Sequence, residues 1–444
     1  MLTNDEALSR AQAAIAAARS AGADAADVAI IADRSTEVSV RLGALEDVAS
    51  SEGVDVSLRV FCGLRSASIS SSELAEASFA ALAERAVAMA REAPEDRWSG
   101  LAPQARLLHG APPALDLDDG GSASPQELRD RALAAEDAAR AIAGVTNSEG
   151  AGASAGETVV ALATSHGFAG AYRTTSYGVS ASVLAGEGGR MQRDSAYHSA
   201  RHQAMLDDAE AIGRQAGERA VAKLDPVKVA SGPMPIVFDP RVGNSLVGHL
   251  LGAVSGPGIA RKTSFLRDRM GHRILPAGVT ITDDPHRPHG LRSRPFDGEG
   301  LPVSPCEFVA DGVLQTWLLD SASARQLGLE PTGHAARGGG VSASNVHLGG
   351  GHVPPKTLIE DIAIGIYVTG LIGSGVNGVT GDYSRGASGF LIENGAIARP
   401  VAEITIAGNL IEMFAGLTPA NDLTFRYGIN APTLRIDGMT VAGD

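Results

Sequence analysis

An Asn-Gly pair near the C-terminus, Asn394-Gly395, constrains the local fold more than any other feature of this sequence. Apolar runs flank it at residues 390–393 and 396–398. Asn-Gly between such runs favours a type I′ turn, because both central residues must accept a positive φ. The sequence therefore predicts a β-hairpin here. The following segment, residues 403–406, alternates polar and apolar side chains, which is typical of a half-buried strand.

The segment before this hairpin carries four side chains that could bind a ligand. Asp382, Tyr383, Ser384 and Arg385 lie between two glycines, Gly381 and Gly386. Functional side chains are common on loops that a rigid scaffold positions. We therefore expect a glycine-flanked loop that leads into the hairpin. All four residues, together with Gly386, are candidates for contacts with a peptide or with a partner subunit.

The same stretch carries a resemblance to a known family. The segments GDYSRGASGF, ENG and PVAEITIAGNL resemble the signature of the TldD/PmbA family of bacterial metalloproteases. The resemblance extends back to GPMPIVFDP and forward to PTLRIDGMTVAG. It covers the C-terminal half well and the N-terminal half only in general layout. Within the family, the chain is similar to the PmbA (TldE) branch. The evidence for this branch is the sequence of one uncharged helix, described next.

That helix is expected to begin at Asp239-Pro240 and has no charged side chain between residues 242 and 256, so we expect it to be buried. TldD proteins carry His-Glu-x-x-x-His at the corresponding place. Two imidazoles at this spacing can hold one Zn²⁺, and the glutamate can activate its bound water. Here Asn244 and Ser245 replace the first histidine and the glutamate, and only His249 remains.

The resemblance therefore implies that this chain has no metal site. A cysteine that supplies a further ligand in TldD proteins has no counterpart, because no cysteine follows Cys306. We expect no cofactor in this chain and a zinc ion in a TldD-type partner. His249 is either a neutral, hydrogen-bonded histidine of a packed helix or a relic ligand that contacts substrate.

Several other histidines are candidate metal ligands by spacing or by their neighbours. His198 and His202 stand four residues apart and could share a helix face, but no glutamate adjoins His198, so a solvated helix start is expected. The segment 283–289 combines two aspartates and two histidines with two prolines, and a rigid loop without a metal is expected. His334 lies in a segment that also resembles the family, where it either lines a cleft or belongs to a structural turn.

Length and patterning predict an α+β protein of two domains. With 444 residues the chain is too long for one typical core. Residues 1–228 read as an α/β domain with Ala-rich helices and with strands at 27–32, 37–42 and 54–61. Residues 229–444 read as a mostly antiparallel β domain, sheet- or barrel-like, with the one buried helix.

Charge and cysteine content limit the partners. The formal net charge of −14 argues against nucleic acid and against an anionic membrane. Cys62 and Cys306 form no CxxC pair, which suits a reducing compartment. The acidic N-terminus lacks the apolar run of a secretory signal. We therefore expect a cytoplasmic protein with neither nucleic acid nor membrane as a partner.

Three functions compete. The first is a PmbA/TldE-like component of a zinc protease that acts on peptides or unfolded proteins; this component is non-catalytic and binds substrate and a TldD-type subunit. Such a chain would form a heterodimer, or a homodimer in isolation. The second is a self-sufficient hydrolase that uses Ser384 or Ser388 with His334 or His249. The third is a peptide-binding scaffold without a protease partner, which would bind extended peptides by strand addition.

Overall fold

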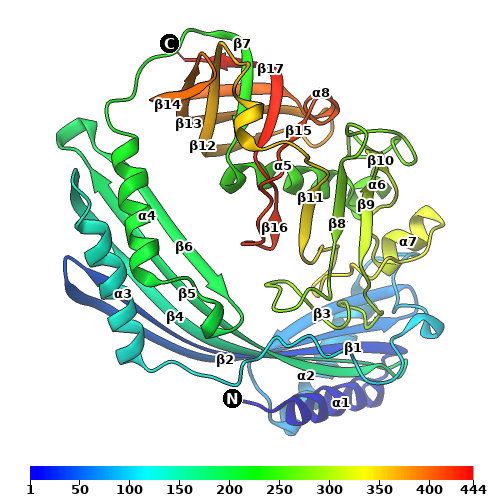
Figure 1. The fold of residues 1–444 in the computed structure, drawn as a ribbon. Helices are drawn as coiled ribbons and strands as arrows, with labels where there is room; N and C mark the ends of the chain where they lie inside the picture. The colour runs from blue at the N-terminus through cyan, green and yellow to red at the C-terminus, as the bar shows by residue number, and fades with distance from the viewer. Residues whose placement is uncertain (444) are drawn as a thin grey trace.

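The computed structural model describes residues 1–443 and shows an α+β architecture (Figure 1). A long curved sheet with four helices forms the N-terminal part, and a barrel with a second, smaller sheet forms the C-terminal part. We propose that the division into two domains lies at residues 228 and 229, where the chain leaves the long sheet and enters the barrel. No helix within residues 1–443 is long and apolar enough to cross a membrane.

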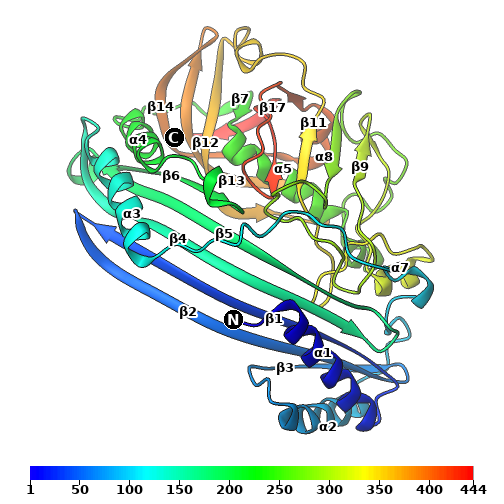
Figure 2. The same cartoon turned by 60° about the horizontal axis from the view of Figure 1, so that its bottom comes forward.

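The N-terminal sheet has six antiparallel strands, and its four central strands are long, at 17 to 20 residues each (Figure 2). The segments 27–32 and 37–42 are predicted as two strands, but residues 27–41 lie in one strand, whose backbone pairs with a strand on each side; Leu42 lies in the turn that follows. In sheet order the strands are β3 (Arg65–Ser71), β2 (Ala44–Cys62), β1 (Ala25–Arg41), β4 (Val145–Thr164), β5 (Ala169–Ala185) and β6 (Gln192–Ala200).

Two pairs of helices cover one face of this sheet at its two ends. On β1, Val28 and Ile30 pack under the first pair, and Val38 and Val40 under the second. Alternate residues of a strand share a face, so both pairs lie on the same side. The helices are α1 (Asn4–Ser20) and α2 (Glu76–Glu92) at one end, and α3 (Pro125–Arg140) and α4 (Ala209–Ala222) at the other.

The starts of three of these helices follow from capping. Thr3 and Ser124 form capping boxes with the glutamates three residues later, and the side chain of Asp208 caps α4. Helix α2 differs from these three, because its N-cap is Ala75 and no side chain caps it. His198 lies on β6 and His202 in the turn after it, so the expectation of a helix start at this pair is wrong.

The opposite face of the sheet contacts the C-terminal half. Ala29 and Leu162, which point away from the helices, pack with Phe168, Phe296 and Leu301. A long connection between α2 and α3 runs along this region and contains the short 3₁₀ helix η1 (Gln104–Arg106). The further 3₁₀ turns of this half are η2 (Gly188–Arg190) and η3 (Gln203–Met205).

The C-terminal half is mostly antiparallel β structure, as predicted, and its larger sheet closes into a barrel. The closing contact pairs Thr405–Ala407 with residues 440–442. In order the strands are β14 (Ala396–Asn409), β13 (Asp382–Glu393), β12 (Ile364–Val376), β7 (Gly232–Phe238), β17 (Leu434–Ala442) and β15 (Thr418–Pro419). Asn394 and Gly395 both have positive φ, and the predicted hairpin joins β13 to β14.

A second sheet and several short helices complete this half. Asp311 and Gly312 form the turn of a second hairpin, between β9 and β10. The sheet order is β10 (Val313–Leu314), β9 (Cys306–Ala310), β8 (Thr280–Asp283), β11 (Val346–Gly349) and β16 (Ile429–Asn430). The helices are α5 (Pro240–Ala253), α6 (Gly256–Ala260), α7 (Ser321–Leu327), α8 (Leu410–Ala415) and the 3₁₀ turn η4 (Pro355–Leu358).

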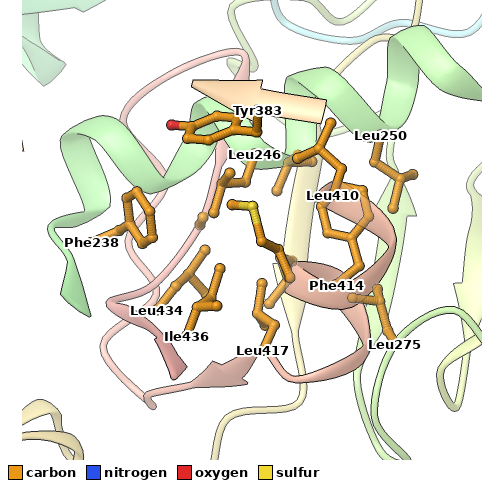
Figure 3. Close-up of a cluster of buried hydrophobic side chains, with 14 of the residues drawn as sticks. Phe238, Leu246, Leu250, Leu275, Tyr383, Leu410, Phe414, Leu417, Leu434 and Ile436 are labelled. Atoms are coloured by element: carbon orange, nitrogen blue, oxygen red, sulfur yellow. The ribbon is translucent and has the colours of Figure 1, made fainter. Parts of the chain in front are cut away.

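The largest core of the protein lies between the barrel and α5 (Figure 3). Leu246 and Leu250 of α5 point into it and meet Tyr383 of β13 and Phe414 of α8. Leu246 and Leu250 are fully buried, and burying a leucine side chain stabilises a fold by about 1.5–3 kcal/mol. This packing fixes the orientation of α5 relative to β13, the strand that carries the family signature. The candidate site lies between these two elements.

Candidate functional site

Helix α5 presents two different faces. Asp239 caps it by accepting a hydrogen bond from the backbone of Arg241 (2.9 Å), and Pro240 occupies its first turn. Leu246 and Leu250 lie on its buried face, whereas Asn244, Ser245, Gly248 and His249 are only half-buried. A side chain at Gly248 or Gly252 would meet no atom within 4 Å. The second face of α5 is therefore open above its glycines.

Three polar side chains meet at this helix without hydrogen-bond partners among the described residues. They are His249 through Nε2, Tyr383 through its hydroxyl and Arg385 through Nε. The rings of His249 and Tyr383 pack edge to face with centroids 6.0 Å apart. The structure thus brings together two groups of residues that the sequence suggested separately. Unpartnered buried polar atoms are rare and often mark places where a ligand or water binds.

Burial and charge keep this cluster in defined protonation states. Burial lowers the pKa of His249, and the positive charge of Arg385 lowers it further. Burial raises the pKa of Tyr383 to about 12, although nearby Arg385 opposes that shift. At neutral pH the cluster therefore holds a neutral imidazole, a neutral phenol and one cation.

The signature residues lie on a strand, so the expectation of a glycine-flanked loop is wrong. Strand β13 begins at Asp382 and pairs on both sides: Tyr383 lies opposite Val376 of β12 and Gly408 of β14. Backbone pairing on two sides outweighs the glycines. Successive side chains of a strand point to opposite faces, so Tyr383 is buried while Asp382 and Ser384 are exposed.

The remaining predicted residues have structural partners or lie apart. Asp382 accepts hydrogen bonds from Thr380 (2.6 Å) and Asn409 (3.2 Å), which fasten the start of β13. Gly386 is half-buried beside Ile372. His334 is 3% exposed. Its ring nitrogens contact Thr332 (2.8 Å) and Asp283 (3.2 Å), so it is not accessible as a surface contact.

A cavity of about 590 Å³ opens at the N-terminal end of α5, between the two halves of the chain. Arg241 and Tyr367 line it from the C-terminal half, and Arg219 and Tyr197 from the N-terminal half. Its volume is in the range of ligand pockets. Local sequence patterns missed this cavity, because its walls come from elements that are far apart in the sequence and none of them carries a motif.

Strand β6 lies at the edge of the long sheet and borders this cavity. The backbone carbonyls of three alternate residues of β6 accept hydrogen bonds from lysine or arginine side chains. Strand β6 pairs only with β5 within the described residues. The carbonyls of Arg193, Ser195 and Tyr197 accept bonds from Lys223 (3.5 Å), Arg219 (3.2 Å) and Arg426 (3.2 Å), respectively. These carbonyls would otherwise offer an unpaired edge to another chain.

The residues at α5 do not fit a catalytic zinc ion. Zinc in proteins takes imidazole, thiolate or carboxylate ligands. The family resemblance places two histidine ligands and a glutamate base at positions 244, 249 and 245. Of the residues present there, only His249 carries a group that can bind zinc. Arg385 adds a positive charge beside it. Within residues 1–443, His249 belongs to no group of three histidine, cysteine or carboxylate side chains close enough to hold a metal.

The chain belongs to the PmbA/TldD family of metallopeptidases. Residues 231–443 match the PmbA/TldA metallopeptidase C-terminal domain, residues 118–224 match the central domain, and residues 26–90 match domain 1. Domain 1 contains strands β1 to β3 and the central domain contains β4 to β6, so each contributes one half of the same six-stranded sheet.

Individual relatives agree with this assignment. The chain is 37% identical to the metalloprotease PmbA of Escherichia coli O157:H7, over 95% of this chain and 92% of that protein. It is 35% identical to the metalloprotease PmbA homolog of Haemophilus influenzae, over 97% and 95%. A Bacteroides thetaiotaomicron protein described as a candidate modulator of DNA gyrase has the same fold, with TM-score 0.92, 29% identity and full coverage of both chains. TldE from Thermococcus kodakarensis also shares the fold, with TM-score 0.86 and 22% identity over 98% and 100%.

Proposed function

We propose that this chain is a PmbA/TldE-like component of a two-component zinc metalloprotease that acts on peptides or unfolded proteins. In this role it lacks the hydrolytic centre, binds part of the substrate and pairs with a TldD-type subunit that holds the zinc. The observation that carries the proposal is the composition of α5, where Asn244 and Ser245 stand in place of metal-binding groups and the remaining histidine, His249, lies beside the positive charge of Arg385.

The surroundings of α5 support a substrate-binding role. Arg241 and Val242, in the first turn of α5, line the cavity of about 590 Å³. The edge of β6 lies at the wall of that cavity. An extended peptide could pair with β6 by strand addition, since peptide N–H groups can replace the cations that now cap its carbonyls. Strand addition at the signature strand β13 is excluded by its two neighbours.

The self-sufficient hydrolase is the weaker alternative. A serine nucleophile needs a histidine with a free ring nitrogen as its base. Both nitrogens of His334 are engaged by Thr332 and Asp283. His249 lies against Tyr383 and Arg385, and no hydrogen bond connects it to Ser384 or Ser388 within the described residues.

The test is reconstitution of peptide cleavage. The purified chain is assayed against unfolded protein and extended peptides, alone and with a TldD-type subunit that carries His-Glu-x-x-x-His. We expect no cleavage by the chain alone, complex formation by size-exclusion chromatography with light scattering, and cleavage by the mixture. Zinc-dependent cleavage by the isolated chain that is lost in His249→Ala would overturn the proposal.

A second arm separates this function from a stand-alone peptide-binding scaffold. If peptides bind the isolated chain but no complex forms with any TldD-type subunit tested, the chain is a stand-alone peptide-binding scaffold and the subunit proposal is wrong. Arg219→Ala should strengthen peptide binding at the β6 edge, because it removes the cation that competes with a peptide for the carbonyl of Ser195, whereas Arg399→Ala is a matched control. Arg399 pairs with Glu393 (2.8 Å) at the exposed hairpin and does not line the cavity.

A further inference from the structure

We propose that Asp116, His202 and His289 form a binding site for one divalent transition-metal ion, with zinc as the best fit, that fastens the two halves of the chain together. The site shares no residue with α5, the β6 edge or the large cavity, and it does not rest on the proposed protease role. Each of these three residues offers one possible ligand atom, and the three atoms all lie within 4.8 Å of one another. Within residues 1–443, no other set of three histidine, cysteine, aspartate or glutamate side chains meets this condition.

The three ligand atoms converge on one small volume. The Nε2 atom of His289 lies 2.7 Å from Oδ2 of Asp116, and Nε2 of His202 lies 3.3 Å from Oδ1 of the same carboxylate. The two imidazole rings lie against each other with centroids 4.4 Å apart and ring planes inclined by 59°. Tetrahedral zinc with bonds of about 2.0–2.1 Å places its ligands about 3.3 Å from one another. Small movements of the side chains would therefore suffice for an ion to enter between them.

Each ligand comes from a different segment, and each segment is held by its own contacts. Asp116 adjoins Leu117, whose carbonyl accepts a bond from the backbone of Thr175 (2.9 Å). His202 follows Arg201, whose guanidinium donates to the carbonyl of Thr175 (3.1 Å).

His289 lies in the loop after β8 of the C-terminal half. Asn345 braces that loop by donating to Ser293 (2.8 Å) and to the carbonyl of Asp284 (2.8 Å). Arg201 also donates to the carbonyl of Leu291 (2.5 Å), which ties this loop to the end of β6. The backbone thus positions all three ligands before any metal arrives, as an effective metal site requires.

The ligand chemistry selects the class of ion. Two neutral imidazoles and one carboxylate suit zinc and other first-row transition metals, and they do not suit calcium or magnesium, which prefer oxygen ligands. His202 and His289 keep 20% and 28% exposure of their side chains, so water can complete the coordination. Asp116 and His202 belong to the N-terminal half and His289 to the C-terminal half. Binding would therefore add one link between the halves.

The test uses the full chain after removal of metal, without partner or peptide. Zn²⁺ is titrated by calorimetry, and bound metal is counted by elemental analysis after dialysis. We expect about one equivalent. Three variants each remove one ligand: His202→Gln, His289→Gln and Asp116→Asn. Loss of a residue that merely supports a ligand weakens metal binding roughly 10–100-fold. We expect each of these variants to weaken zinc binding by at least that factor. Asparagine tolerates the positive φ of Asp116, so that variant keeps the backbone.

Two matched controls locate the ion. His249→Gln changes the histidine of α5, and His272→Gln changes an exposed histidine of the C-terminal half; both should bind as wild type does. Zinc should also raise the melting temperature of wild type but not of the three site variants, because an ion that binds only the folded state stabilises it. Equal binding by wild type and His289→Gln would overturn the site. So would loss of binding in His249→Gln, which would place the ion at α5. Neither result depends on protease activity, so the subunit proposal is tested separately.

Discussion

The imidazole of His249 meets the phenol ring of Tyr383 edge to face, with centroids 6.0 Å apart and ring planes inclined by 74°. This contact joins the helix that lacks the metal ligands to the strand that carries the family signature. Tyr383 is 1% exposed, and its hydroxyl has no partner among the described residues. A buried aromatic ring thus occupies the place beside His249, and the polar tips of both residues stay free.

The free hydroxyl of Tyr383 leads to a first prediction. Tyr383→Phe should leave the free energy of unfolding within about 1 kcal/mol of wild type, or raise it, because no hydrogen bond is lost. Tyr177 is a matched control: it is equally buried, but its hydroxyl donates to Asp119 (2.8 Å). Tyr177→Phe should cost about 1.5–3 kcal/mol, since the acceptor is charged. Denaturant unfolding of both variants measures the difference, and equal losses would contradict the geometry.

A second prediction concerns the titration of His249. Its folded pKa lies below the ordinary value of about 6.5, because of burial and of Arg385. As pH falls below about 6.5 the unfolded chain binds a proton that the folded chain resists. The stability from neutral His249 is therefore complete above that pH and decreases as pH falls toward the folded pKa. NMR titration of the ring should give a pKa below 6.5, and Arg385→Gln should raise it. A pKa above 6.5 in wild type would refute this account.

The hairpin turn provides a third prediction. Gly395 has φ 78°, and a Cβ there would overlap the carbonyl oxygen of Glu360. Gly395→Ala should therefore destabilise the protein through both strain and clash, by about 2–4 kcal/mol. Gly373 has nearly the same φ, 79°, but open space around it. Gly373→Ala isolates the strain and should cost only about 1–2 kcal/mol. Thermal unfolding compares them, and equal melting temperatures would argue against the clash.

A buried ion pair between the two halves provides a fourth prediction. Asp27 of β1 is 1% exposed and contacts Arg59 and, from the C-terminal half, Arg337 (both 2.5 Å). Burial alone would raise the pKa of Asp27, but the two guanidinium groups outweigh it and hold that pKa below its usual range.

Asp27→Asn should lower the free energy of unfolding by about 3–5 kcal/mol, because it leaves buried charges without a partner. The exposed pair of Arg399 and Glu393 serves as the control. Glu393→Gln should change stability by less than about 1 kcal/mol. Denaturant unfolding at pH 7 checks both values; a loss at Asp27 as small as that at Glu393 would show that the buried pair does not hold the halves together.

Local sequence patterns alone determined several parts of this protein. The turn at Asn394-Gly395, the capping boxes at Thr3 and Ser124, and the helix start at Asp239-Pro240 each depend on residues within a few positions of one another. The expectation that Asn244 and Ser245 replace metal ligands likewise comes from adjacent residues, together with the family resemblance. These features were predictable because short-range backbone preferences and side-chain chemistry decide them.

Only the tertiary structure decided two other features: the conformation of residues 382–385 and the cluster of Asp116, His202 and His289. Both features depend on contacts between segments that are far apart in the sequence. Asp382–Arg385 became a strand rather than a loop when β12 and β14 paired with it on both sides. The sequence neighbours of His202 and of His289 do not predict a metal site at either histidine. Only the packing of the C-terminal loop against the end of β6 places them together, on the carboxylate of Asp116. A metal site requires atoms a few ångströms apart, and no spacing in this sequence encodes that proximity.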